Sequence, residues 1–451
     1  MKTLLSVLLI LSLFSKSVFG DDKKIELPSQ VLFTNVHVWD GTSDGITKKI
    51  NVLIENNLIK KVRADINDAH AEAQIIDGNG KVLMPGLSDA HSHLTIFDTP
   101  SKLFNDHHWA YSGALMSKEA NLMLHRGFTT IRDAGGPTYG LAKAINEGHI
   151  PGPRIYPSGH FIGQTSGHTD FRSYNEIHQR DRMHRSNLEN NWAFLADGAD
   201  EVRARTREVL RLGGTQIKLS VGGGVASPFD PIDTTQYSVD EIRAAVEAAK
   251  GWGTYVMVHA YHDESAVNAL NAGAKSIDHG TLIKKSSTMK LMKEKGAFFV
   301  PQALIFSVTE EQISAFPPAL QPKLRLVVNG LDVSLKLAKK HGVKIAFGTD
   351  SMGSSVALAR NNLELGARLK WFEPIDILKQ ATSINGELFA MSGPRNPYKE
   401  GPLGIVQAGA YADLLLVDGN PLENITLLHD YENNIKIIMK DGKVYKNTLQ
   451  N

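Results

Sequence analysis

Six side chains that can bind a metal lie within or at the ends of short apolar stretches of this 451-residue chain. They are His91, His93, Lys218, His259, His279 and Asp350. His91 and His93 are two residues apart, so on a β-strand their imidazoles leave the same face and can bind one ion. Taken singly, each histidine could belong to the core or the surface, and Asp350 could cap a helix. Their common position at strand ends favours one shared metal site.

Lys218 is the least expected of these residues, because it lies inside the apolar stretch TQIKLSV. A buried ammonium is costly unless it is paired or chemically modified. The chain has no cysteine, which excludes disulfides, thiolate nucleophiles and cysteine-bound zinc. Any metal must therefore be held by histidine, a carboxylate or a modified side chain.

The elements that position these residues alternate between strands and amphipathic helices. Eight stretches predict strands: 82–93, 128–133, 154–160, 215–221, 255–259, 276–279, 297–301 and 344–350. Helical patterns between strands include 239–250, 288–295 and 329–340. Eight such units predict an α/β fold of the (β/α)8 TIM-barrel type, in which the carboxyl ends of the strands meet at one face. A doubly wound open sheet is the competing arrangement, but no glycine-rich dinucleotide motif follows the first strand.

Both ends of the chain have sequence patterns typical of β-strands. Near-alternating stretches at 31–38 and 51–59 resemble those at 412–417 and 435–445, where Asp441-Gly442 is a hairpin signal. We therefore predict a small β-sandwich domain built from both chain ends. Its two parts would be residues 21–84 and 399–451, with the metal-binding barrel domain over 85–398.

The N-terminal segment predicts export of the protein. Lys2, an apolar run and the polar stretch SKSVFG are typical of a signal peptide over residues 1–20. We expect a secreted or periplasmic protein, with no stable membrane insertion after signal removal. The formal net charge of +1 gives no reason to expect a nucleic-acid partner.

Several motifs resemble the amidohydrolase superfamily. They are PGLSDAHSHL at 85–94, GFTTIRDAGG at 127–136, GPRIYPSG at 152–159 and AGAYADLLLVDGNP at 408–421. The second and third resemble its imidazolonepropionase-related and Xaa-Pro dipeptidase-like branch. The resemblance implies two divalent metal ions, with Zn²⁺ the expected metal, bridged by a CO₂-derived carboxylate on Lys218 (N6-carboxylysine). It implies His91, His93 and Asp350 around the more buried ion. His259 and His279 would hold the more exposed one.

The resemblance also implies roles in catalysis. A hydroxide bridging the metals would attack a carbonyl carbon, with Asp350 as general base and then acid. His168, in the loop QTSGHTD, would hydrogen-bond the carbonyl oxygen, and Tyr261 would bind a substrate carboxylate. The alternatives are a surface-loop histidine for His168 and simple packing for Tyr261.

We expect hydrolysis of an amide (C–N) bond in a small molecule, with dipeptides or N-acyl amino acids as the leading substrates and a homo-oligomer as the assembly. The alternative within enzymes is a hydrolase of cyclic amides, lactones or xenobiotic carboxamides of the mycotoxin type. A deaminase or isomerase on the same scaffold, and a non-catalytic binding protein on a decayed barrel, are two further classes. All six metal positions are filled, which argues against the decayed barrel.

Overall fold

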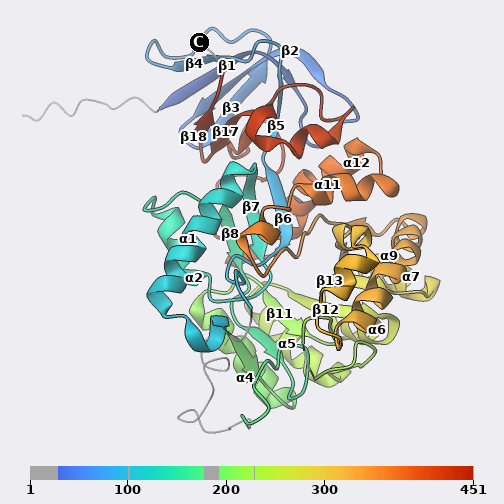
Figure 1. The fold of residues 1–451 in the computed structure, drawn as a ribbon. Coiled ribbons are helices and arrows are strands. Elements are labelled where there is room, and N and C mark those ends of the chain that lie inside the picture. Colours follow the sequence, from blue (N-terminus) through green and yellow to red (C-terminus); the bar gives the residue numbers. More distant parts are fainter. Residues whose placement is uncertain (1–28, 100–101, 177–191, 228, 450–451) are drawn as a thin grey trace, which may run out of the picture.

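The computed structural model describes residues 29–99, 102–176, 192–227 and 229–449. The predicted signal peptide lies outside these residues. Strands from the two chain ends form one eight-stranded sheet, drawn at the top of Figure 1. Its strands are β1 (Gln30–Val38), β2 (Thr47–Glu55), β3 (Leu58–Arg63), β4 (Gln74–Asp77), β5 (Val82–Pro85), β16 (Leu414–Val417), β17 (Ile435–Lys440) and β18 (Lys443–Asn447). The two chain ends are joined where β5 pairs antiparallel with β16.

The apolar stretch 82–93 divides at Gly86 instead of forming one strand. β5 belongs to the eight-stranded sheet, while β6 (Leu87–Ser92) begins a separate parallel sheet. A Cβ at Gly86 would lie 2.1 Å from Oγ1 of Thr129, so only glycine allows the chain to pass this point.

Two parallel sheets make up the larger part of the fold. The first has the order β6-β7-β8, and the second has the order β10-β9-β11-β12-β13-β14-β15. The strands not yet given are β7 (Phe128–Asp133), β8 (Arg154–Pro157), β9 (Phe161–Gly163), β10 (Ala193–Leu195), β11 (Ile217–Ser220), β12 (Val256–His262), β13 (Ser276–Leu282), β14 (Phe298–Val300) and β15 (Lys344–Ile345). β9 and β10 were not predicted, because three residues are too few to show an alternating pattern.

Backbone hydrogen bonds connect both edges of the three-stranded sheet to the seven-stranded sheet. Beside β8, the amide of Thr215 donates to the carbonyl of Pro157 at 2.8 Å. Beside β6, the amide of Ala90 donates to the carbonyl of Phe347 at 2.7 Å, and the amide of Asp350 donates to the carbonyl of His91 at 2.8 Å. The last bond brings two of the predicted metal ligands to one place.

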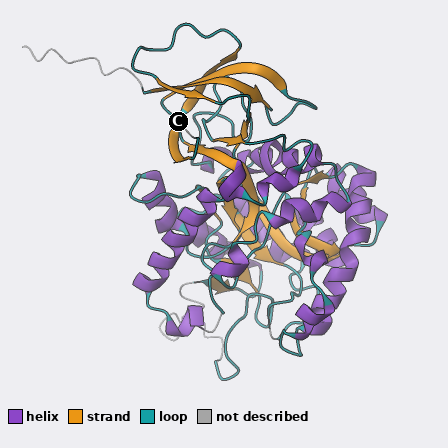
Figure 2. Ribbon diagram, turned by 45° about the horizontal axis from the view of Figure 1, so that its top comes forward, coloured by secondary structure: helices purple, strands orange, loops and turns teal. Residues whose placement is uncertain are grey.

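Helices surround the parallel strands, as Figure 2 shows in purple around orange. The main ones are α1 (Trp109–His125), α2 (Tyr139–Asn146), α4 (Ala199–Leu212), α5 (Val239–Gly251), α6 (Asp263–Ala272), α7 (Ser286–Glu294) and α9 (Gln321–His341). Shorter ones are α8 (Glu310–Ser314), α10 (Ser355–Leu358), α11 (Leu363–Ala367), α12 (Pro374–Lys379), α13 (Asn385–Ala390) and α14 (Tyr431–Asn434). α9 begins eight residues before the predicted 329. Within the described ranges, no helix has both the length and the apolar composition needed to cross a bilayer.

Candidate metal centre

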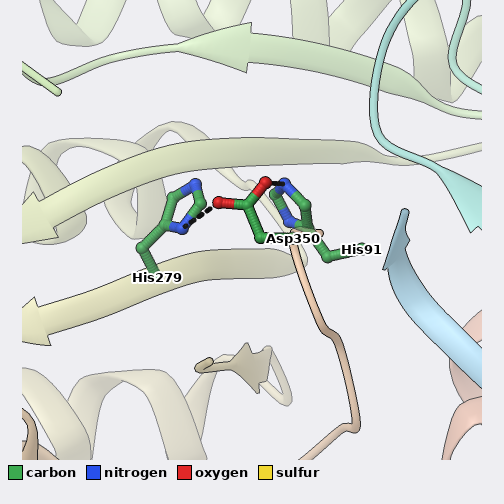
Figure 3. Close-up of side chains that lie close together, drawn as sticks. All are labelled: His91, His279 and Asp350. Atoms are coloured by element: carbon green, nitrogen blue, oxygen red, sulfur yellow. Dashed lines mark ion pairs between the residues drawn. The ribbon is translucent and has the colours of Figure 1, made fainter. Parts of the chain in front are cut away.

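The carboxylate of Asp350 lies between histidines that come from two different strands. Its Oδ1 is 3.5 Å from Nε2 of His91 and 3.2 Å from Nε2 of His93. Its Oδ2 is 3.8 Å from Nδ1 of His279. Figure 3 shows Asp350 between the rings of His91 and His279. Potential ligand atoms of these three residues all lie within 4.8 Å of one another.

The tautomers of His91 and His93 follow from the partners of their Nδ1 atoms. Nδ1 of His91 lies 2.6 Å from the carboxylate of Asp278, and Nδ1 of His93 lies 3.3 Å from the carbonyl oxygen of Gly135. Both partners only accept hydrogen bonds, so each Nδ1 carries the proton and each Nε2 carries a lone pair. The two Nε2 atoms are 3.2 Å apart. Lone pairs that face each other at this distance require an electron-pair acceptor between them.

Asp350 provides a third acceptor at the same point. Its Oδ1 is buried and receives no hydrogen bond from the described residues. Three acceptor atoms thus converge, and a bound cation would satisfy all of them. Imidazole nitrogen and carboxylate oxygen are suitable ligands for Zn²⁺. This part of the site therefore fits a divalent metal.

The backbone at two of these residues adopts an unusual conformation. His279 has φ of 73° and Asp350 has φ of 51°, in the left-handed region that non-glycine residues seldom occupy. On a regular strand Asp278 and His279 would face opposite sides. Both nevertheless lie beside His91: the Asp278 carboxylate contacts Nδ1, and the His279 ring centroid is 4.8 Å from that of His91. The positive φ of His279 accounts for the lost alternation.

Three further rings extend the cluster beyond Asp350. The His259 ring centroid lies 4.4 Å from that of His279 and 4.0 Å from that of His168, on which it stacks. Tyr261, two residues after His259 on β12, stacks on His279 at 5.1 Å. Nε2 of His259 donates to the carbonyl of Gly223 at 3.1 Å, which leaves its Nδ1 with the lone pair. The structure thus brings together the five predicted histidines and Tyr261.

Lys218 lies one strand away from His259. β11 pairs with β12 in a register that sets Lys218 opposite Met257, two residues before His259. The lysine is 2% exposed, and no described carboxylate lies within ion-pairing distance of its ammonium. Burial lowers the pKa of Lys218 to about 8, although the charges of Asp278 and Asp350 oppose this shift. A neutral amine is the form that can react with CO₂.

Burial also favours the uncharged form of four histidines in the cluster. It is the largest cause that lowers the pKa of His91, His259 and His279 below the ordinary value. Burial likewise lowers the pKa of His168 to about 4, against the opposing charge of Asp230. Neutral imidazoles are the form that binds metals.

Sequence reasoning missed the residues that hold these ligands in place. Asp278 accepts from His91 and also from Nη2 of Arg132 at 2.9 Å, and Gln302 Oε1 lies 2.8 Å from Nδ1 of His279. Arg132 thus forms a buried ion pair with Asp278, which lies 146 residues further along the chain. Asp278 directly precedes a predicted ligand, and this adjacency was the one available signal.

This chain matches a known protein family over most of its length. Residues 82–445 match the amidohydrolase family, and the chain belongs to that family. It is 31% identical to the ochratoxinase of Aspergillus niger over 386 residues, which are 81% of this chain and 76% of that protein. The protein is therefore an enzyme that hydrolyses its substrate.

Solved structures support the same assignment. A prolidase complexed with N-methylphosphonate-L-proline has a TM-score of 0.85 and 33% identity, covering 93% of this chain and 100% of the other. A Xaa-Pro dipeptidase with bound methionine has a TM-score of 0.81 and 29% identity, with the same two coverages. The fold is accordingly a TIM-barrel-type α/β fold with an additional sheet domain.

Proposed function

We propose that the protein is a binuclear metal-dependent hydrolase that cleaves an amide bond in small substrates, either dipeptides or N-acyl amino acids. The observation that carries this proposal is the convergence of three acceptor atoms, from His91, His93 and Asp350, beside the ring of His279. The similarity to dipeptidases and to an ochratoxinase supports the amide bond as the target.

The scaffold for this chemistry is a closed (β/α)8 barrel over residues 85–398. The edge hydrogen bonds at Pro157 and Phe347 support closure. A shared cluster of side chains from β8, β12 and β14, including Tyr156, Met257 and Val300, supports a filled interior. Residues 21–84 and 399–451 would form a β-sandwich, because Phe33, Leu83 and Leu416 from distant strands share one core.

His91, His93 and Asp350 would hold one ion, and His259 and His279 the other. Lys218 would bridge them as N6-carboxylysine, which also removes a buried positive charge. Two bound Zn²⁺ ions would make a water molecule acidic and polarise a substrate carbonyl. Asp350 would be the group that takes up a proton from the attacking water and returns it to the leaving nitrogen.

His168 and Tyr261 are the candidates for substrate contacts. Both lie against the ring of His259, at centroid distances of 4.0 Å for His168 and 5.1 Å for Tyr261. Burial raises the pKa of Tyr261, so its hydroxyl stays protonated and can donate to a substrate carboxylate.

A second candidate is a hydrolase of xenobiotic carboxamides, favoured by the 31% identity to the ochratoxinase. Cyclic amides and lactones are further substrates of this kind. Purified protein should be tested with Xaa-Pro dipeptides, N-acyl amino acids, ochratoxin-like carboxamides and lactones, with zinc measured by mass spectrometry. About two zinc ions per chain and turnover of an amide would support the proposal. Metal-free protein that hydrolyses none of these substrates would refute it.

We also propose that the protein is exported and assembles as a homo-oligomer. The signal-like sequence of residues 1–20 supports export. Cell fractionation with a C-terminal tag tests the location, and N-terminal sequencing tests cleavage after Gly20. Light scattering after size-exclusion chromatography tests the assembly, and a mass of one chain would contradict it.

A further inference from the structure

A buried polar network fixes the ring of His168. Nδ1 of His168 lies 2.7 Å from the hydroxyl of Ser227, and that hydroxyl donates to the carboxylate of Asp230. The backbone amide of His168 donates to Oε1 of Gln236 at 2.9 Å. Both Ser227 and Asp230 are buried. The ring is therefore held by its own backbone and by its Nδ1 edge.

Asp230 is surrounded by donors, which fixes the direction of these bonds. The amide of Gly224 donates to its Oδ2 at 2.8 Å, and Nε2 of Gln236 donates to the same oxygen at 3.1 Å. The ammonium of Lys323 lies 3.6 Å from Oδ1. A carboxylate only accepts, so the single proton of Ser227 is directed to Asp230. The lone pair of that hydroxyl then faces Nδ1 of His168.

This direction decides the tautomer of the ring. Nδ1 must carry the proton that it donates to Ser227, so in the neutral imidazole Nε2 carries the lone pair. Glycine at 224 keeps this arrangement possible, because a Cβ there would lie 2.0 Å from Nδ1 of His168. The ring is still partly exposed, and its Nε2 lies on the edge away from Ser227.

We infer that Ser227 and Asp230 are positioning residues that make Nε2 of His168 a hydrogen-bond acceptor for an N–H group of the substrate. This inference rests on the proposed amide hydrolysis and refines it. In the neutral ring, a donor from Nε2 to the carbonyl oxygen would need the opposite tautomer. The preferred substrates are therefore secondary amides, whose scissile nitrogen bears a hydrogen, as in N-acyl amino acids. An Xaa-Pro bond lacks that hydrogen.

The kinetic test compares N-acetyl-L-phenylalanine with its N-methyl analogue. The zinc-loaded wild-type enzyme should prefer the N–H substrate by about tenfold in kcat/KM. Ser227→Ala releases the ring, so this preference should fall to about twofold or less, while Ser227→Thr keeps the hydroxyl and the preference. An equal preference in wild type and Ser227→Ala would mean that the methyl group acts only by its bulk, which overturns the inference.

A second measurement does not depend on turnover. In protein labelled with ¹⁵N-histidine, the ring nitrogens of His168, assigned by comparison with His168→Gln, should report protonation at Nδ1 in wild type and not in Ser227→Ala. Protonation at Nε2 in wild type would overturn the inference. Zinc lost in His168→Gln would also overturn it, because the ring would then be a metal ligand. If neither substrate turns over but Nδ1 carries the proton, the proposed function fails and the positioning of His168 stands.

Discussion

The carboxylate of Asp278 lies 2.6 Å from Nδ1 of His91. The same oxygen accepts from Arg132, so a buried ion pair on the parallel strands orients a candidate metal ligand. A carboxylate in this position fixes the ring and makes its other nitrogen a better ligand.

Replacing Asp278 by Asn should weaken metal binding. The amide keeps the shape but loses the charge that holds His91 and balances Arg132. We expect the dissociation constant for zinc to rise about 10- to 100-fold, measured by competition with a chelator. The control is Asp332→Asn, on the outer helix α9, which should leave the dissociation constant for zinc unchanged. Equal zinc affinity in Asp278→Asn and wild type would contradict the orienting role.

Asp350→Asn should separate catalysis from metal binding. Asparagine keeps an oxygen that can face the histidines but cannot take the proton of the attacking water. We predict a fall in kcat of about 10²- to 10⁴-fold with metal content largely retained. Steady-state kinetics and metal analysis of the same sample check this, and a variant with wild-type kcat would exclude Asp350 as the base.

Lys218→Met should remove the proposed bridge between the ions. Methionine suits the apolar surroundings of β11, so we expect a folded protein that binds less than one zinc per chain. Intact-mass measurement under non-denaturing conditions should find about 44 Da on the wild-type chain and none on the variant. Two zinc ions in Lys218→Met would show that the lysine does not bridge them.

Arg154→Met should destabilise the contact between the parallel strands and the sheet domain. Arg154 donates to Asp413 at 2.8 Å and to Asp441 at 2.6 Å, and lies 3.9 Å above the ring of Tyr411. Losing one partner of a buried pair costs about 3–5 kcal/mol, measurable as the free energy of unfolding in urea.

The matched control for Arg154 is Arg211→Met. Arg211 pairs with Glu208 at 2.6 Å on the exposed side of α4. Its loss should change the free energy of unfolding by about 1 kcal/mol or less. Similar effects of the two substitutions would mean that Arg154 does not join the domains.

Stability should fall in mild acid because of His429. Its Nε2 accepts from the amide of Gly366 at 3.1 Å, and burial lowers its pKa below 6.5. The unfolded chain therefore takes up the proton first, so the stabilisation is full above pH 6.5 and is lost as the pH falls toward the folded pKa. His429→Asn should lose less thermal stability than wild type between pH 7.5 and 5.

The convergence of the candidate metal-binding residues could be predicted, because a TIM-barrel-type fold gathers the ends of its strands at one face. The supporting residues could not. Asp278 pairs with Arg132, which lies 146 residues earlier in the chain, so no local pattern reveals the contact. Asp278 and His279 both lie beside His91 because the positive φ of His279 interrupts the alternation of side chains along the strand. The break at Gly86 also escaped prediction, since both halves of that stretch are apolar.

The pairing of β5 with β16 has a consequence for synthesis on the ribosome. β1 to β5 emerge early, but β5 must wait for residues 414–417 before its outer edge finds a neighbour. During that interval the nascent chain carries an open edge, to which another polypeptide could add. Pairing with β16 closes that edge in the folded protein.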